Sequence, residues 1–379
     1  MTETATTDSP ATSWSSLAQV LGARFAERAM QLDETDAFAA ENFAELKQYR
    51  VLSAGVPTEF GGGGASYREL AEFLRILAHH CSSTALTLSM HTHTIARTVW
   101  TWKHMNAPVA PLLQRVATEQ LMLVSTGGND WLESLGIAES APGGFRIRAR
   151  KPFASGGPAG DALATSAVYN DPEAGPTVLH FSVPIRAEGV RIMSNWRTVG
   201  MRATGSDDVM FEDVFVPAES VQARRPKGVW HPAIHLAGMI AFPLVYSVYL
   251  GVAEAARDIA IGLVSAEKRR EPLVQLMAGE MENRLMAARL AVQRMVDLGA
   301  DATPGAEVTN AIFTARTLAA EAALACVDRA MELAGGKGFF RAAGLERRLR
   351  DIQAARYHPM RVKDQQLFAG RMALGVPIE

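Results

Sequence analysis

A change of pattern between residues 121 and 217 constrains the fold of this chain more than any other feature. Inside this stretch, short segments rich in Val, Phe and Thr are separated by Gly, Asn, Asp and Pro, a pattern typical of β-strands joined by turns. On both sides of it, apolar residues recur at helical spacing. A β-module between two helical blocks predicts an α+β fold, because an α/β fold needs strands and helices to alternate.

The pattern divides the chain into four expected parts. We expect a disordered leader over residues 1–13, which lacks the basic and apolar segments of a secretory signal. An N-terminal α-helical domain should follow over 14–120, and a middle β-domain, built as a barrel or sandwich and facing the cofactor, over 121–230. Long helical patterns joined by short turns predict a four-helix bundle over 231–379.

One segment of the last part is long and apolar enough to raise the question of a membrane. Leu236 to Ala253 carries no charge and reaches the threshold length for a transmembrane helix. Pro243 interrupts it, and Glu254 follows at once on the same helical pattern. We therefore expect a buried core helix and no association with a membrane.

Composition limits the partners of the chain. A net charge of −2 over 379 residues leaves no basic excess to neutralise phosphates, which argues against nucleic-acid binding. Cys81 and Cys326 lie far apart in apolar helical context, so we expect buried thiols in a reducing cytoplasm. No His, Cys, Asp or Glu spacing predicts a metal site.

Six strings occur in an order that is characteristic of one family. They are GVPTEFGGGG at 55–64, VSTGGND at 124–130, RKPFASG at 150–156, GMRATGSDDVMFEDVFVP at 200–217, YLGVAEAARD at 249–258, and AGGKGFFR with LERRLRD within 334–351. With these strings the chain resembles the acyl-CoA dehydrogenase-fold flavoproteins from about Trp14 to Leu374. The resemblance implies a flavin between the β-domain and the C-terminal helices, in a homotetramer arranged as a dimer of dimers.

The two glycine turns at 125–130 and 154–161 are expected to meet the flavin. Its ring needs hydrogen-bond donors near N1 and O2 and a partner at N5, and backbone amides in a turn can supply the former. The cofactor-binding residues that the resemblance implies are Ser125 and Thr126 on the pyrimidine side, Phe153, Ala154 and Ser155 beside N5, Arg202, Thr204 and Ser206 near the phosphates or ribityl chain, and Gly335 and Gly336 near the phosphate or adenosine side, reached from a neighbouring subunit. Each turn also has the composition of an ordinary β-turn.

The identity of the flavin stays open between FMN and FAD. Many relatives carry an Arg, a Phe-Gly pair and a Gln that contact the FAD pyrophosphate and adenine between the first two C-terminal helices. This chain has only SAEKRREPLVQ at 265–275, which is shorter and has no Phe-Gly. Arg269, Arg270 and Gln275 remain candidates, and FMN or a loosely held reduced flavin becomes an alternative to tightly bound FAD.

The base that acyl-CoA dehydrogenation requires is missing from its usual positions. That reaction removes an α-proton and needs a carboxylate on the substrate face opposite the flavin. The resemblance places the usual Glu at Pro359 and the alternative Glu at Ala241. Neither proline nor alanine can accept a proton.

The residues near those positions resemble the flavin-dependent two-component monooxygenase branch of the same fold. In that branch a His on the third helix, a Ser near N5 and a His after the Arg-Asp pair surround the C4a-oxygen adduct of the flavin. The matching catalytic candidates are His91, Ser155 and His358, and imidazole suits the task because its ordinary pKa lies near neutral pH. His93 is the weaker alternative, since a residue two positions away faces another side of the helix.

Three functions follow from these observations. The first is an oxidoreductase that uses FMNH2 or FADH2, supplied by a separate flavin reductase, and O2 to oxygenate a small organic substrate through a C4a-hydroperoxyflavin. The second is an acyl-CoA or acyl-carrier dehydrogenase with bound FAD and a base relocated to His358 or Tyr357. The third is a catalytically inactive flavin-binding scaffold.

Overall fold

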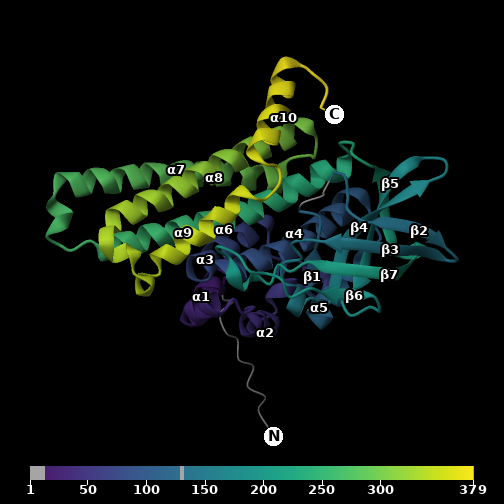
Figure 1. The fold of residues 1–379 in the computed structure, drawn as a ribbon, viewed down its shortest axis with the longest axis horizontal. Coiled ribbons are helices and arrows are strands. Elements are labelled where there is room, and N and C mark those ends of the chain that lie inside the picture. Colours follow the sequence, from purple (N-terminus) through teal and green to yellow (C-terminus); the bar gives the residue numbers. More distant parts are fainter. Residues whose placement is uncertain (1–12, 129–131, 379) are drawn as a thin grey trace, which may run out of the picture.

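The three structural regions follow one another along the chain as the sequence predicts. The computed structural model describes residues 13–128 and 132–378, so the expected leader lies outside the described residues except for Ser13. In Figure 1 the sheet lies at one end of the molecule, and the long C-terminal helices extend away from it past the N-terminal helices. The predicted α+β fold, with N-terminal helices, a central sheet and C-terminal helices, is confirmed.

The N-terminal region consists of helices that pack around α3 and α4. Its helices are α1 (Trp14–Thr35), α2 (Ala40–Gln48), α3 (Tyr67–His80), α4 (Ser82–Met105) and α5 (Ala110–Glu119). Helix α3 begins with a capping box, in which the hydroxyl of Ser66 accepts the amide of Glu69 and the Glu69 carboxylate accepts the amide of Ser66.

The middle region forms a single eight-stranded sheet in the order β6-β7-β3-β2-β4-β5-β8, with β1 paired to β4. Its strands are β1 (Leu123–Ser125), β2 (Ile137–Ala141), β3 (Gly144–Lys151), β4 (Ala162–Asp171), β5 (Gly175–Pro184), β6 (Val190–Ile192), β7 (Val209–Pro217) and β8 (Val221–Pro226). Strand β4 is parallel to β1 and β2 and antiparallel to β5. Alternate residues of the strands, among them Ile147, Leu179 and Phe211, form a separate hydrophobic core.

The C-terminal region contains three long helices and two short ones. They are α6 (Pro232–Leu263), α7 (Pro272–Asp301), α8 (Ala306–Ala334), α9 (Leu345–Ile352) and α10 (Val362–Leu374). The expected bundle is thus built from α6, α7 and α8, and the short α9 packs against α6 and α8 (Figure 1). Gly335 follows α8 with a φ of 57°, which a glycine adopts without strain.

Helix α6 is the centre of the helical part of the molecule. It contains the apolar run from Leu236 to Ala253, and 89% of its most apolar 18-residue window is buried inside the protein, so the prediction of a buried core helix is confirmed. Its side chains join those of the N-terminal and C-terminal helices in one continuous core. At Gly251 a Cβ atom would lie 2.1 Å from the carbonyl oxygen of Arg75, so glycine is what allows α6 and α3 to approach this closely.

Both cysteines are free and buried, as the sequence predicts. Burial raises the pKa of the Cys326 thiol to about 12. This thiol therefore stays protonated at neutral pH and behaves as a small apolar side chain.

Candidate active site

Helix α4 is the element on which the candidate site is assembled. It packs against β1, against the short helix η4 (Arg202–Thr204) and against α6. These contacts place it between the sheet and the C-terminal helices, where the resemblance implies the flavin. Three histidines determine the chemistry of the site: His91 and His93 of α4, and His358 in the turn after α9.

His91 is fully buried, and both of its ring nitrogens bond to backbone groups. Nε2 lies 2.7 Å from the carbonyl oxygen of Leu52, and Nδ1 accepts the amide of Leu123 at 3.0 Å. A neutral ring with its hydrogen on Nε2 satisfies both contacts. The expectation of a catalytic role for His91 is therefore corrected: it joins α4 to η1 (Val51–Ser53) and β1, and no ring nitrogen remains for a bound molecule.

His93, which the sequence ranks second, lies beside Ser125, one of the expected flavin contacts. It is partly buried, and its Nε2 lies 3.3 Å from the hydroxyl oxygen of Ser125. Burial, the charge of Arg97 and a contribution from His358 lower the pKa of His93 to about 3. The ring of His93 is therefore neutral at pH 7.

His358 is paired with a buried tyrosine of α6. Its Nε2 lies 2.5 Å from the hydroxyl of Tyr249, which is 1% exposed. Burial raises the pKa of Tyr249 and lowers the pKa of His358 to about 3, so both groups are neutral and the phenol donates to the imidazole. Nδ1 of His358 has no hydrogen-bond partner within the described ranges and is not enclosed by protein atoms, which leaves it accessible to a bound molecule.

Arg316 of α8 holds the turn that carries His358. Its Nη2 donates to the carbonyl oxygens of Ala355 at 3.1 Å and His358 at 2.7 Å. Its guanidinium lies over the ring of Tyr246, 5.3 Å from the centroid. The side chain is fully buried, so these contacts fix the backbone beneath the His358–Tyr249 pair.

The histidines do not titrate near neutral pH, contrary to the argument from their ordinary pKa. Burial is the largest cause in each case, and it lowers the pKa of His91 to about 4 and the pKa of His358 to about 3. The cation of Arg316 adds to the effect at His358. At pH 7 these rings are neutral groups that can accept or donate a hydrogen bond without carrying charge.

This depression of the pKa predicts that stability falls in mild acid. Below about pH 6.5 an unfolded histidine binds a proton, whereas His91 in the folded chain, with a pKa of about 4, does not. The effect of His91 on the free energy of unfolding is therefore nil above pH 7. As the pH falls toward 4 this free energy decreases progressively, by about 2 kcal/mol at pH 5. Urea unfolding at pH 7 and pH 5 measures this loss of unfolding free energy. In His91→Gln the loss should be smaller by about 2 kcal/mol. An equal loss in the variant and the wild type would contradict the low pKa of His91.

Ser155 belongs to a chain of buried hydroxyl groups. Its Oγ lies 2.7 Å from Oγ of Ser206, which lies 2.7 Å from Oγ1 of Thr204. Thr204 in turn donates to the carbonyl of Met201 at 3.0 Å. The structure thus brings three of the expected residues together. Because Thr204 donates to Met201, Ser206 donates to Thr204 and Ser155 donates to Ser206, which fixes the Ser155 hydroxyl and leaves its oxygen able to accept a hydrogen bond.

Phe153 presents an aromatic ring beside this chain from a strained backbone. Its φ is 62°, a region that bulky residues rarely adopt, and its side chain is 48% exposed. The ring meets Trp196 edge to face, with centroids 6.2 Å apart. Ala154 behind it is fully buried, and its amide donates to the carbonyl of Asp207.

The first glycine turn offers fewer backbone donors than expected. The amide of Thr126 donates to the carbonyl of Ala164, and its hydroxyl donates to Thr165 at 2.6 Å. The expectation that the Thr126 amide serves the cofactor is therefore corrected, because strand pairing with β4 uses it. Ser125 keeps its hydroxyl toward His93, and the Asn129 and Asp130 end of the turn lies outside the described residues.

Three expected flavin contacts lie apart from this cluster. Arg202 bonds to the carbonyl of Thr198 and forms an ion pair of 3.6 Å with Asp36, so its charge is engaged at the end of α1. Gly335 and Gly336 lie in η7 (Gly335–Phe339) at the end of α8, and nothing would contact a Cβ atom at either position. A single chain thus leaves these two glycines open to an external contact, and the flavin contact expected of Arg202 stays a prediction.

The turn between α6 and α7 uses its polar residues internally. Arg269 donates to the carbonyls of Val264 and Ile261, both at 3.2 Å, and Gln275 donates to the carbonyl of Arg269. These bonds cap the end of α6. Two of the three candidates for adenosine contacts are thus occupied.

The buried carboxylates of the described residues all have structural partners. These pairs are Asp33 with Arg350, Asp207 with the amide of Trp196, Glu254 with Arg75 and Arg289, and Asp351 with Ser82 and the amide of Met201. A carboxylate that is buried and bonded to such partners cannot turn toward a bound substrate. None of the four is therefore available for α-proton abstraction.

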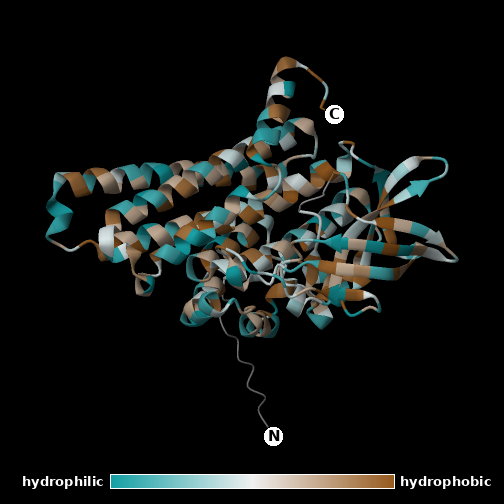
Figure 2. Cartoon of the chain, in the orientation of Figure 1, coloured by the Kyte–Doolittle hydropathy of each residue, from teal (hydrophilic) through white to brown (hydrophobic). Residues whose placement is uncertain are grey.

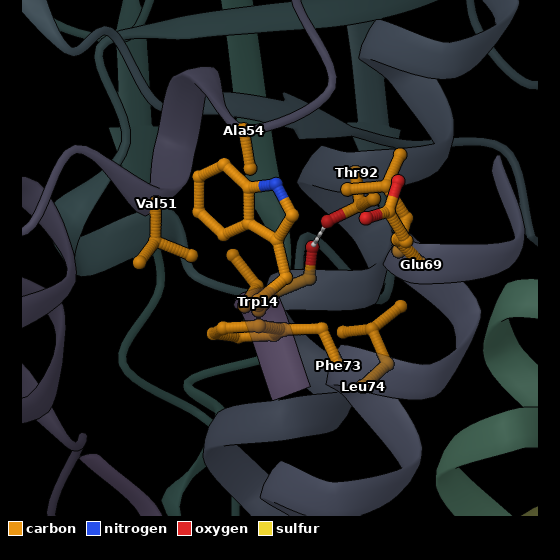
Figure 3. A pocket seen from close by; sticks show the side chains of 9 residues that line it. Trp14, Val51, Ala54, Glu69, Phe73, Leu74 and Thr92 are labelled. Carbon is orange, nitrogen blue, oxygen red and sulfur yellow. Dashed lines mark hydrogen bonds between the residues drawn. The ribbon is translucent and has the colours of Figure 1, made fainter. Parts of the chain in front are cut away.

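A small pocket in the N-terminal region is distinct from this site. Figure 3 shows it between Trp14, Val51, Phe73 and Leu74, with an almost entirely apolar wall. Glu69 at its edge belongs to the capping box of α3. The pocket contains none of the expected catalytic or flavin residues.

Sequence reasoning missed Tyr249 and Arg316. Tyr249 stands in the quoted string YLGVAEAARD, and Tyr246 three residues earlier shares its helix face, which is a usable signal. Arg316 is the single charge within AIFTARTLAA, and a lone charge on an apolar helix suggests a buried, engaged side chain. In both cases the partner, His358, lies too far along the sequence to be identified.

Comparisons with known proteins agree with this geometry. The chain matches the acyl-CoA dehydrogenase N-terminal domain over residues 14–103 and the acyl-CoA dehydrogenase C-terminal domain over residues 244–362. It is 28% identical to the L-evernosamine nitrososynthase of a Micromonospora species, over 93% of this chain and 88% of that protein. It is 24% identical to the probable FMNH2-dependent monooxygenase SfnC of Pseudomonas putida, over 90% of each. The solved structure of KijD3 in complex with FMN and a dTDP-linked amino sugar superimposes with a TM-score of 0.86 at 25% identity, covering 98% of this chain and 96% of that one.

The two matched domains together cover more than half of the chain. They flank the sheet in the order that the six strings indicate, and the relatives extend over nearly the whole length. The chain therefore belongs to the acyl-CoA dehydrogenase family.

Proposed function

We propose that this protein is a flavin-dependent monooxygenase that receives reduced FMN from a separate reductase and uses O2 to oxygenate a small organic substrate. One observation carries the proposal: the base positions hold Pro359 and Ala241, and the group beside Pro359 is the neutral His358–Tyr249 pair. Proton abstraction next to a thioester needs a carboxylate. A neutral imidazole backed by a phenol can hold or move a proton at Nδ1 without adding charge.

The residues present fit the flavin ring. The exposed ring of Phe153 with Trp196, the hydroxyl of Ser125 and the hydroxyl chain ending at Ser155 offer aromatic surface and hydrogen-bond partners. FMN is favoured over FAD because Arg269 and Gln275 already bond within the α6–α7 turn. The complex of KijD3 with FMN supports this choice, and reduced flavin would supply the electrons for O2.

In the proposed reaction the residues of the site divide into those that handle the substrate proton and those that contact the flavin. His358 handles the proton on the substrate side, Tyr249 orients it, and Arg316 positions its backbone. His93 orients the Ser125 hydroxyl, and Ser155 contacts the flavin edge near N5. His93 thus takes the role that the sequence suggested for His91.

A dehydrogenase with a relocated base is less well supported. Tyr357, one of its two candidate bases, is 77% exposed. The other, His358, has a pKa lowered to about 3 and so is a weak base. Removal of a weakly acidic α-proton favours a stronger base than this.

The reaction of the reduced protein with oxygen tests the proposal. Protein with anaerobically reduced FMN is mixed with O2 in a stopped-flow spectrometer. The absorbance of oxidised FMN should return markedly later than in a control with free FMN, because a site that excluded water would slow unproductive reoxidation of the reduced flavin. Immediate return of that absorbance, together with bleaching of bound FAD by an acyl-CoA, would overturn the monooxygenase assignment in favour of the dehydrogenase.

The assembly and the location complete the proposal. Exposed apolar side chains gather on α7 and α8, namely Leu273, Leu276, Met286, Leu290 and Leu318. Figure 2 shows hydrophobic residues interspersed with hydrophilic ones along α7. This surface fits the homotetramer that the resemblance implies, and the two free thiols fit a cytoplasmic protein.

A further inference from the structure

Arg97 is a cation beside the candidate site, and no described residue supplies it with a counter-charge. It follows His93 by four residues on α4, so both side chains lie on the same face of the helix. Its guanidinium is partly buried and forms no hydrogen bond or ion pair within residues 13–128 and 132–378. Its nitrogens are not enclosed by protein atoms, so the guanidinium is accessible to a bound anion.

The sheet contributes more positive charge to the same region. On β5, Nε2 of His180 accepts a hydrogen bond from Nε of Arg225 at 3.1 Å. Burial, Arg225, Arg97 and Lys151 together lower the pKa of His180 to about 3. The positive charge of Arg97 therefore acts on two imidazoles, those of His93 on the helix and His180 on the sheet, and lowers the pKa of each.

The neighbouring cations Arg225 and Lys151 have partners, whereas Arg97 has none among the residues that the structure describes. Arg225 also donates to the carbonyl of Leu132 at 2.7 Å, and Lys151 donates to Ser134 at 3.3 Å. The buried carboxylates of the described residues are engaged elsewhere, and Glu133 pairs with Lys227 at 3.6 Å. Within the described residues, Arg97 is thus the cation of this region whose guanidinium is left for a bound molecule.

We propose that Arg97 binds an oxyanion of the substrate, a carboxylate, sulfonate or phosphate, and so orients the substrate beside His93 and His358. The planar guanidinium can form two parallel hydrogen bonds to such a group. The inference rests on the proposed function, because the anion bound at Arg97 is taken to be the substrate that the monooxygenase oxygenates. It restricts the substrate class to small organic anions, and it makes Arg97 a specificity residue.

Binding to the oxidised protein with FMN tests this inference without turnover. The probes are benzoate and benzenesulfonate, with neutral benzamide as the matched control, and calorimetry measures their affinities. The anions should bind at least about tenfold more tightly than benzamide, and Arg97→Met should remove this preference, since one charge-assisted pair supplies it. Arg97→Lys should retain part of it, and Arg115→Met, which alters an exposed arginine on α5, should change nothing.

Two further readouts exclude other roles for Arg97. The thermal midpoint of Arg97→Met should be equal to or above that of the wild type, because the substitution removes an unpaired buried charge; a clear drop would show a structural role and overturn the proposal. FMN affinity should be unchanged, and its loss would assign the cation to the flavin phosphate instead. Equal affinity for benzoate and benzamide in the wild type would also overturn it. Because these measurements involve no oxygen, their failure is separate from failure of the oxygen experiment.

Discussion

Replacing His358 with alanine is expected to lower oxygenated product by about two to four orders of magnitude, the range for loss of a positioned acid or base. The ring is bonded to Tyr249 through Nε2 and leaves Nδ1 accessible, so its removal takes away the group that handles the substrate proton. FMN affinity should stay within about a factor of three, since the expected flavin contacts come from Ser125 and the Ser155 segment. The measurement compares product with hydrogen peroxide for each reduced FMN consumed.

Two matched variants separate this role from a general loss of structure. Tyr249→Phe removes only the phenol that orients His358, and should cost about tenfold in product formation. His79→Ala removes a histidine that pairs with Asp258 on the outside of the helices, and should leave the yield unchanged. If His358→Ala still directs all reducing equivalents to product, the proposed role of His358 is wrong.

The second large effect concerns stability and separates the two histidines of α4. His91→Ala is expected to lower the free energy of unfolding by about 3–5 kcal/mol, because the carbonyl of Leu52 and the amide of Leu123 would both lose a buried partner, at about 1–3 kcal/mol each, and a cavity would remain. The product yield per folded molecule should fall far less than in His358→Ala. Urea unfolding and product yield on the same samples measure both quantities.

His93→Ala should show the opposite behaviour. The ring is partly buried and makes a single bond of 3.3 Å to Ser125, so stability should change by about 1 kcal/mol or less. Product formation should fall by about tenfold or more, since the hydroxyl of Ser125 would lose its orienting partner. A stable but inactive His91→Ala together with a fully active His93→Ala would return the catalytic role to His91.

The fold could be predicted from the sequence because strands, helix ends and buried helices are each marked by residues close together in the chain. The alternation within 121–217 marks strands wherever one face of a sheet is buried, and Gly335 marks a helix end because its φ of 57° suits glycine. The charges directly after Ala253 separated a buried α6 from a membrane helix. Each of these signals lies within a few residues of the feature it predicts.

The site was predicted less completely because its features depend on residues distant in the sequence. Nothing near His91 indicates that Leu52 and Leu123 would occupy both ring nitrogens, since those partners lie 39 and 32 residues away. The low pKa of His358 likewise depends on burial beside Arg316, which only the packed structure determines. Spacing on α4 correctly indicates that His91 and His93 face different sides, but not which side meets the sheet.

The position of α6 has a consequence for how this molecule unfolds. Because its side chains belong to the one continuous core formed by the helices before and after the sheet, the two helical halves bury apolar surface against the same helix. Unfolding of either half would expose the apolar side chains of α6 to water. The two halves should therefore unfold together in one cooperative transition. Tyr249, the hydrogen-bond partner of His358, lies on this shared helix. Its position should therefore be kept until the helical regions unfold.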